Sequence, residues 1–99
     1  MKFLIPKKLK VGARTYRVEW VKDLHNPQQE ACWGYWNPAT QAIQLDVDLK
    51  DNLEHAAVVL LHEALHGLNS DLRLGLEEDD THRLAAGLAQ VFADNKLME

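Results

Sequence analysis

Hydrophobic and polar residues alternate along the first half of the chain with the period of two that is typical of β-strands. The alternation runs from Lys10 to Val21 and again from Gln41 to Asp48, and a short aromatic stretch runs from Cys32 to Trp36. The residues between the last two stretches, Asn37-Pro38-Ala39-Thr40, have the composition of a turn. The pattern therefore predicts three strands in an antiparallel sheet.

The hydrophobic period changes to 3.6 residues after Asp51, which predicts an α-helix that ends near Asn69. Asp51 is the expected N-cap, and Glu54, three residues later, completes a capping box. This helix carries apolar residues on two sides, so we expect both sides to be covered. The main apolar face consists of Leu53, Ala56, Ala57, Leu60, Ala64, Leu65 and Leu68, and the opposite stripe consists of His55, Val59, His62 and His66.

A second helix is predicted from about Glu77 to Asn95, and it is the expected cover for the histidine-bearing stripe. Its first turn is acidic, which suits the positive end of a helix dipole. The elements together predict an α+β fold, in which a three-stranded antiparallel sheet packs against the first helix and a second, C-terminal helix. The length of 99 residues accommodates a single domain over residues 1–99.

Composition and charge restrict which cellular compartments and which classes of partner we expect. The net charge of −4 argues against nucleic acid as the main partner. Cys32 is the only cysteine, so no internal disulfide can form and a reducing compartment is expected. The sequence contains no evident signal peptide or membrane-spanning stretch. We therefore expect a cytoplasmic protein that does not enter a membrane.

The most informative stretch is His62-Glu63-Ala64-Leu65-His66, which has the HExxH pattern. Two histidines four residues apart lie on one face of a helix, one turn from each other, so both imidazoles can bind one zinc ion. The glutamate after the first histidine then lies beside the metal, where it can accept a proton from water. The sequence therefore predicts His62 and His66 as metal ligands and Glu63 as a general base.

A catalytic zinc ion normally has three protein ligands, so a third ligand must come from another element. Carboxylates at the start of the second predicted helix are the candidates, and Glu78 is preferred because it shares a helical stripe with His82 and with small residues that allow close approach. Glu77 remains an alternative, since it shares a stripe with Leu84, Leu88 and Val91 that also looks inward. Asp79 is the third candidate.

Other residues near these elements have weaker functional signals. His82 lies one turn after Glu78, where it could support a ligand or contact a substrate. We interpret His25 and His55 as structural, because an isolated histidine usually is. The aromatic residues at 33, 35 and 36 are interpreted as sheet packing, although a phenol at Tyr35 could help to stabilise an oxyanion near the metal.

The chain resembles the small zincin-like proteins of phages and prophages, which are similar to reduced ImmA/IrrE-type metallopeptidases. The resemblance covers most of the chain, although only the HExxH pattern is specific by itself. It implies a minimal zincin fold and a glutamate ligand from the following helix, which maps best onto Glu78. At His82 the chain departs from the family, in which an acidic or amide residue is expected. The supporting stretches are Leu61–His66, Leu76–Asp80, Arg83–Leu88, Lys7–Gly12 and Ile43–Asp46.

These observations predict a zinc metallopeptidase that hydrolyses peptide bonds in a peptide or protein substrate, in the cytoplasm of a bacterial host. In similar zincins an edge strand binds the substrate, and the stretch from Ala42 to Val47 is its expected counterpart, with Gln44 and Asp46 facing away from the core. The alternative is a zinc-stabilised phage accessory protein that binds a partner without peptidase activity. A DNA-binding protein is disfavoured by the acidic charge balance.

Overall fold

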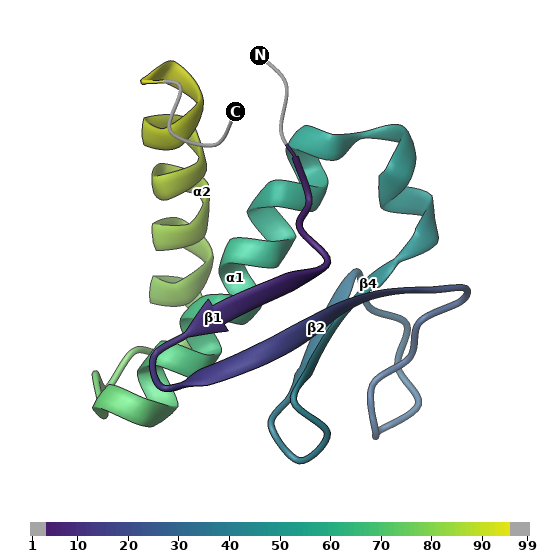
Figure 1. Cartoon of the computed structure of the whole chain (residues 1–99), viewed down its shortest axis with the longest axis horizontal. Coiled ribbons are helices and arrows are strands. Elements are labelled where there is room, and N and C mark those ends of the chain that lie inside the picture. The colour runs from purple at the N-terminus through teal and green to yellow at the C-terminus, as the bar shows by residue number, and fades with distance from the viewer. Residues whose placement is uncertain (1–3, 96–99) are drawn as a thin grey trace.

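The computed structural model describes residues 4–95 and has the predicted α+β composition (Figure 1). Helix α1 crosses one face of the sheet, and α2 packs against α1 (Figure 1). Neither helix in the described range combines the length and apolar character needed to cross a membrane. In chain order the elements are β1 (Lys8–Val11), β2 (Arg14–Val21), β3 (Gly34–Asn37), β4 (Ala42–Asp46), the short 3-10 helix η1 (Val47–Asp51), α1 (Leu53–Leu72) and α2 (Glu78–Asp94).

The sheet differs from the predicted three-stranded antiparallel arrangement, because it has four strands in the order β1-β2-β4-β3. The outer pairs are antiparallel, but β2 and β4 are parallel. The predicted first strand is a hairpin, in which Gly12 turns the chain at a φ of +62° that favours glycine. A long connection after β2 then carries the chain past the position of β4, so that β3 forms the edge and β4 returns between β2 and β3.

The central position of β4 contradicts the prediction that the stretch from Ala42 to Val47 is an edge strand. Both sides of β4 pair with other strands, so it has no free edge for a peptide. Asp46 also does not face solvent; it is buried, and its carboxylate accepts hydrogen bonds from the backbone N–H groups of Leu24 and Asp48 at 3.0 and 2.9 Å. Within residues 4–95, both edge strands, β1 and β3, contact α1, and β3 is the edge that passes close to Glu63.

The core lies between the sheet and α1. Helix α1 begins one residue later than predicted, with Asn52 rather than Asp51 as the N-cap, because Asp51 ends η1 and the Asn52 side chain accepts a hydrogen bond from the His55 N–H. It continues past Asn69 to Leu72 and ends at Arg73 in the left-handed conformation. The predicted apolar face is buried except for Leu53, which is exposed, and Leu68, which is half-buried. The core cluster consists of Val11, Tyr16, Ile43, Leu45, Leu49, Ala56, Val59, Leu60 and Ala64.

Helix α2 contacts α1 through a stripe of small residues. Thr81, Ala85 and Ala89 are buried, and their short side chains allow the two helix axes to approach closely. The opposite stripe was expected to look inward, but Leu84 and Val91 are each 43% exposed. The small-residue stripe carries Glu78 toward α1, so this packing determines which acidic residue reaches the histidines.

Candidate metal centre

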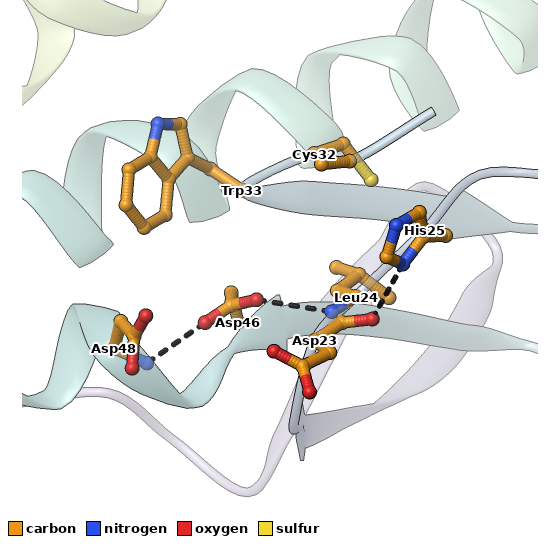
Figure 2. Close-up of a pocket in the computed structure, with 8 residues that line it drawn as sticks. Asp23, Leu24, His25, Cys32, Trp33, Asp46 and Asp48 are labelled. Carbon is orange, nitrogen blue, oxygen red and sulfur yellow. Dashed lines mark hydrogen bonds between the residues drawn. The ribbon is translucent and has the colours of Figure 1, made fainter. Parts of the chain in front are cut away.

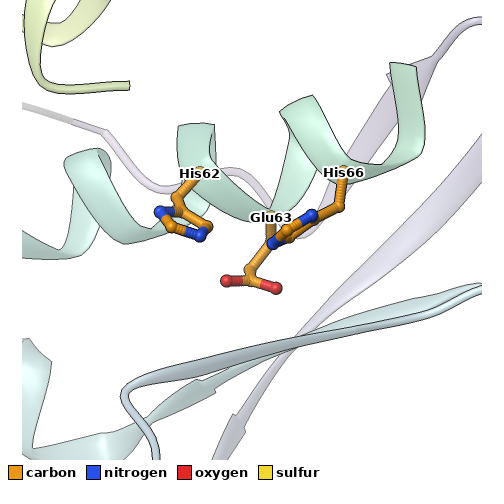
Figure 3. Close-up of side chains that lie close together, drawn as sticks. All are labelled: His62, Glu63 and His66. Atoms are coloured by element: carbon orange, nitrogen blue, oxygen red, sulfur yellow. The ribbon is translucent and has the colours of Figure 1, made fainter. Parts of the chain in front are cut away.

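Helix α1 presents His62, Glu63 and His66 toward one small volume beside the sheet (Figure 3). One potential ligand atom from each residue lies within 4.8 Å of the others, which is close enough for a group that could hold a metal ion. The two imidazoles project from successive turns because their spacing of four residues nearly matches the helical repeat. The predicted pair of histidines and the predicted base are therefore together in the folded protein.

The carboxylate of Glu78 is brought to both imidazoles by the start of α2. Its Oε1 lies 2.6 Å from His62 Nε2, and its Oε2 lies 3.4 Å from His66 Nε2. Within residues 4–95, these are the only carboxylate–imidazole pairs closer than 4.0 Å. Two imidazole nitrogens and one carboxylate thus converge on one point, and this donor set suits a divalent metal ion.

The two alternative carboxylates have other positions. Glu77 is the N-cap of α2, and its backbone N–H donates to the Asp80 carboxylate at 3.1 Å in a reciprocal capping box. Asp79 lies one position further along the helix and forms no pair with either histidine within 4.0 Å in the described range. The geometry therefore favours Glu78 over Glu77 and Asp79 as the partner of the histidines.

Glu63 is buried beneath these groups, with an exposed fraction of 8%. Loss of solvation raises the pKa of its carboxyl group to about 7, and the negative charge of Glu78 acts in the same direction. A hydrogen bond from the Trp36 backbone opposes both effects. A carboxyl group with a pKa near neutrality can both accept and release a proton under ordinary cellular conditions.

Burial also acts on His66, although in the opposite direction. It lowers the pKa of the imidazole, as does the nearby His62, while the negative charge of Glu78 raises it. The neutral imidazole is the form that binds a metal ion. The environment of His66 therefore favours the protonation state that a ligand requires.

Strand β3 comes unusually close to α1 at the position of Gly34. A Cβ atom at this residue would lie 2.5 Å from Val59 Cγ1 and 3.2 Å from Glu63 Cγ, so a side chain here would collide with the helix. The absence of a side chain lets the edge strand pass directly over the buried glutamate. The sequence pattern contains no signal for this requirement, because it depends on the distance between two elements that are far apart in the chain.

Aromatic and histidine rings lie around the imidazoles of His62 and His66 on α1. Trp36 stacks on His66 with ring centroids 6.4 Å apart and an interplanar angle of 21°. The His82 ring lies 6.0 Å from the His62 ring, so His82 is a neighbour of this histidine. Side chains alternate along a strand, so Gly34 and Trp36 face α1 and Tyr35 faces the other side of the sheet. Tyr35 is therefore in the wrong place to act on an oxyanion at this site.

A cavity of about 220 Å³ opens beside His62 and Glu63. Trp33 and His55 contribute to its wall, and their rings meet edge to face with centroids 5.4 Å apart. We expected both residues to be merely structural, and the structure places them at the site. The spacing of seven residues between His55 and His62, two helical turns, was the available signal for His55. The cavity is lined by Trp33, Gly34, His55, Val58, Val59, His62, Glu63 and His82.

A second cavity, of about 370 Å³, is also lined by Trp33 (Figure 2). Trp33 and Cys32 form one side of it, and the carboxylates of Asp46 and Asp48 lie on the other (Figure 2). The hydrogen bonds of Asp46 to the backbone hold the connection after β2 against the end of β4. Burial raises the pKa of the Cys32 thiol, and the charges of Glu63, Asp46 and Glu30 raise it further. These effects favour the protonated form of the Cys32 thiol.

Comparison with known proteins adds no relative: no protein-family model, curated protein or solved structure matches the chain.

Proposed function

We propose that the protein is a zinc-dependent metallopeptidase in which His62, His66 and Glu78 bind zinc and Glu63 is the general base. The observation that carries the proposal is the convergence of two imidazole nitrogens and the Glu78 carboxylate above a buried glutamate. The Glu78 carboxylate lies 2.6 Å from His62 Nε2 and 3.4 Å from His66 Nε2, so these three side chains would be the ones to hold the ion.

The donor set supports zinc in a catalytic rather than a purely structural role. Structural zinc sites usually have four protein ligands, most often with cysteine, whereas catalytic sites have three and keep one position for water or substrate. Two histidines and one glutamate match the catalytic type. A structural site also has no need for a buried carboxylate such as Glu63 beside the ligands.

When bound, zinc would acidify a water molecule and polarise the carbonyl group of the substrate. Glu63 accepts the proton of that water as the carbonyl carbon is attacked, and it then passes the proton to the departing amine. His82, which shares the cavity with Glu63, is available to donate a hydrogen bond to the oxygen on which negative charge develops.

An extended peptide would bind along β3, the edge strand beside the site. Its backbone could add to the sheet by forming hydrogen bonds with the free edge of β3, and Gly34 brings this edge next to Glu63. The HExxH pattern followed by a helix with a glutamate supports placing the protein among the small phage and prophage zincins of the ImmA/IrrE type. A single cysteine is consistent with the cytoplasm of a bacterial host as its compartment.

The test combines metal analysis of the purified protein with a broad peptide-library cleavage assay read by mass spectrometry. We expect about one zinc ion per chain in both the wild type and Glu63→Gln, and cleavage only in the wild type, with a loss of about 10²–10⁴-fold in the variant. Cleavage by Glu63→Gln at the wild-type rate would remove Glu63 from the base role. Zinc without cleavage in the wild type would instead favour a zinc-stabilised binding protein.

A further inference from the structure

The cavity beside the metal-binding group has a buried floor and an open mouth. Val59 and Glu63 are buried, whereas Trp33, His55 and His82 are exposed. The proposed zinc ligand His62 and the proposed general base Glu63 both line the cavity. Any group that enters the cavity therefore lies next to the position where a substrate carbonyl would react.

The walls of this cavity are mainly apolar. Val58 and Val59 from α1, the indole of Trp33 and the bare backbone of Gly34 form them, and no lysine or arginine is among the lining residues. A negatively charged group would therefore find no lysine or arginine partner in the wall of the cavity. The cavity thus favours an uncharged, apolar occupant over an acidic one.

The size of the cavity matches one amino-acid side chain. An apolar cavity of about 150 Å³ in another protein is large enough to hold benzene. The volume of about 220 Å³ here therefore accommodates a side chain of the size of leucine or phenylalanine. The edge-to-face contact between Trp33 and His55 holds one wall in place, and the close passage of β3 over Val59 holds the other.

We propose that this cavity is a specificity pocket that binds the apolar side chain of the residue on one side of the scissile bond. This inference rests on the proposed function, because zinc and Glu63 must hold the reacting carbonyl next to the pocket. It names the substrate class of that site: peptides with a leucine- or phenylalanine-sized residue adjacent to the bond that is cleaved.

The inference can be tested with small hydroxamates, which bind zinc through the hydroxamate group without being cleaved. Acetohydroxamate carries only a methyl group, and 4-methylpentanohydroxamate differs from it by an added isobutyl group. Isothermal titration calorimetry on the zinc-loaded wild type should give a dissociation constant about 10- to 100-fold lower for the second compound, because its isobutyl group becomes buried. Succinate monohydroxamate, which carries a carboxylate instead, should show no such gain.

Val58→Trp should remove this preference, because the larger side chain fills the cavity. Val91→Trp, on the exposed face of α2, is the matched control and should keep the preference. Trp33→Ala provides a second test that leaves α1 intact; it removes a wall and should also reduce the preference. Zinc content and far-ultraviolet circular dichroism verify that each variant is folded and loaded.

The outcomes separate the pocket from the metal site. Equal affinity of the wild type for acetohydroxamate and its isobutyl derivative would overturn the pocket and leave the zinc site standing. A preference that survives both Val58→Trp and Trp33→Ala would also overturn it. If the zinc-loaded protein bound no hydroxamate at all, the metal would have no open position, and the proposed function would fail together with the pocket.

Discussion

The two helices contribute to the candidate site in different ways. Helix α1 lies between the sheet and α2, and it carries both histidines and the buried Glu63. Helix α2 packs on α1 through three small buried residues and exposes a leucine and a valine on its far side. The Glu78 side chain, which it contributes, is 68% exposed.

This contrast shows how the site is held together. The mutual positions of His62 and His66 follow from the geometry of one helix, and burial of the surrounding core keeps that helix in place. The position of Glu78 depends on a narrow contact between two helices. A bound metal ion would join the two helices at the site, so α1 should determine whether a metal binds and α2 how tightly it binds.

The largest expected effect comes from α1. His66→Ala should weaken zinc binding by at least about a hundredfold. Loss of a residue that only hydrogen-bonds to a ligand already costs about 10- to 100-fold, and this change removes a ligand itself. The variant should also lose the stabilisation that zinc supplies to the fold, which a fall in melting temperature would report. His55→Ala, two turns from His62 and outside the ligand set, is the control. Near-stoichiometric zinc in His66→Ala would contradict the ligand assignment.

The burial of Glu63 should make the metal-free fold sensitive to pH. The carboxyl group has a pKa of about 7 in the folded protein and 4.5 as the unperturbed value, so the folded state binds more protons between these limits. Its contribution to stability is fully present below pH 4.5 and is lost as the pH rises through 7. At pH 8, metal-free Glu63→Gln should therefore be more stable than the wild type by on the order of 3 kcal/mol.

Urea denaturation of both proteins in the presence of a chelator, at pH 5 and pH 8, measures this difference. The gap between wild type and Glu63→Gln should widen with pH. Glu54→Gln, at the exposed start of the same helix, controls for the loss of a carboxyl group. If the difference in the free energy of unfolding between the two proteins did not change with pH, ionisation of Glu63 would not destabilise the folded protein, and the prediction would be wrong.

On α2, the expected effect is a weaker metal site rather than its complete loss. Glu78→Gln should raise the dissociation constant for zinc by roughly tenfold or more, because a charged ligand becomes a neutral one. Glu77→Gln, one residue earlier and engaged in the capping box, should leave zinc affinity unchanged. Competition with a chromophoric chelator measures both. The reverse order of effects would assign the third ligand to Glu77.

The smallest expected effect on zinc binding comes from a change in the contact between the two helices. Ala85→Leu adds a larger side chain to the buried stripe of α2, and it should cost about 1–3 kcal/mol of stability through overpacking. Ala86→Leu makes the same change on the exposed side and should stay within about 0.5 kcal/mol. Zinc affinity should fall only in Ala85→Leu, since only that change moves Glu78. Equal stability of the two variants would mean that the contact is loose.

Local patterns predicted the elements but not the sheet. The period-two alternation identified the strands around Tyr16 and Ile43, and the 3.6-residue period identified both helices. The parallel pairing of β2 with β4 was missed, because strand order depends on where a long connection takes the chain. The same error placed the exposed edge at β4 instead of β3.

The sequence by itself determined the group formed by His62, Glu63 and His66. A spacing of four residues on one helix is enough to bring two imidazoles together, whatever the rest of the fold does. The sequence pattern preferred Glu78 without excluding Glu77, and only the tertiary structure showed that the Glu78 carboxylate contacts both histidines. Only the tertiary structure, likewise, placed His55 and Trp33 beside His62 and Glu63 and gave Gly34 its role. Those features depend on distances between elements far apart in the chain, which periodicity along the sequence does not record.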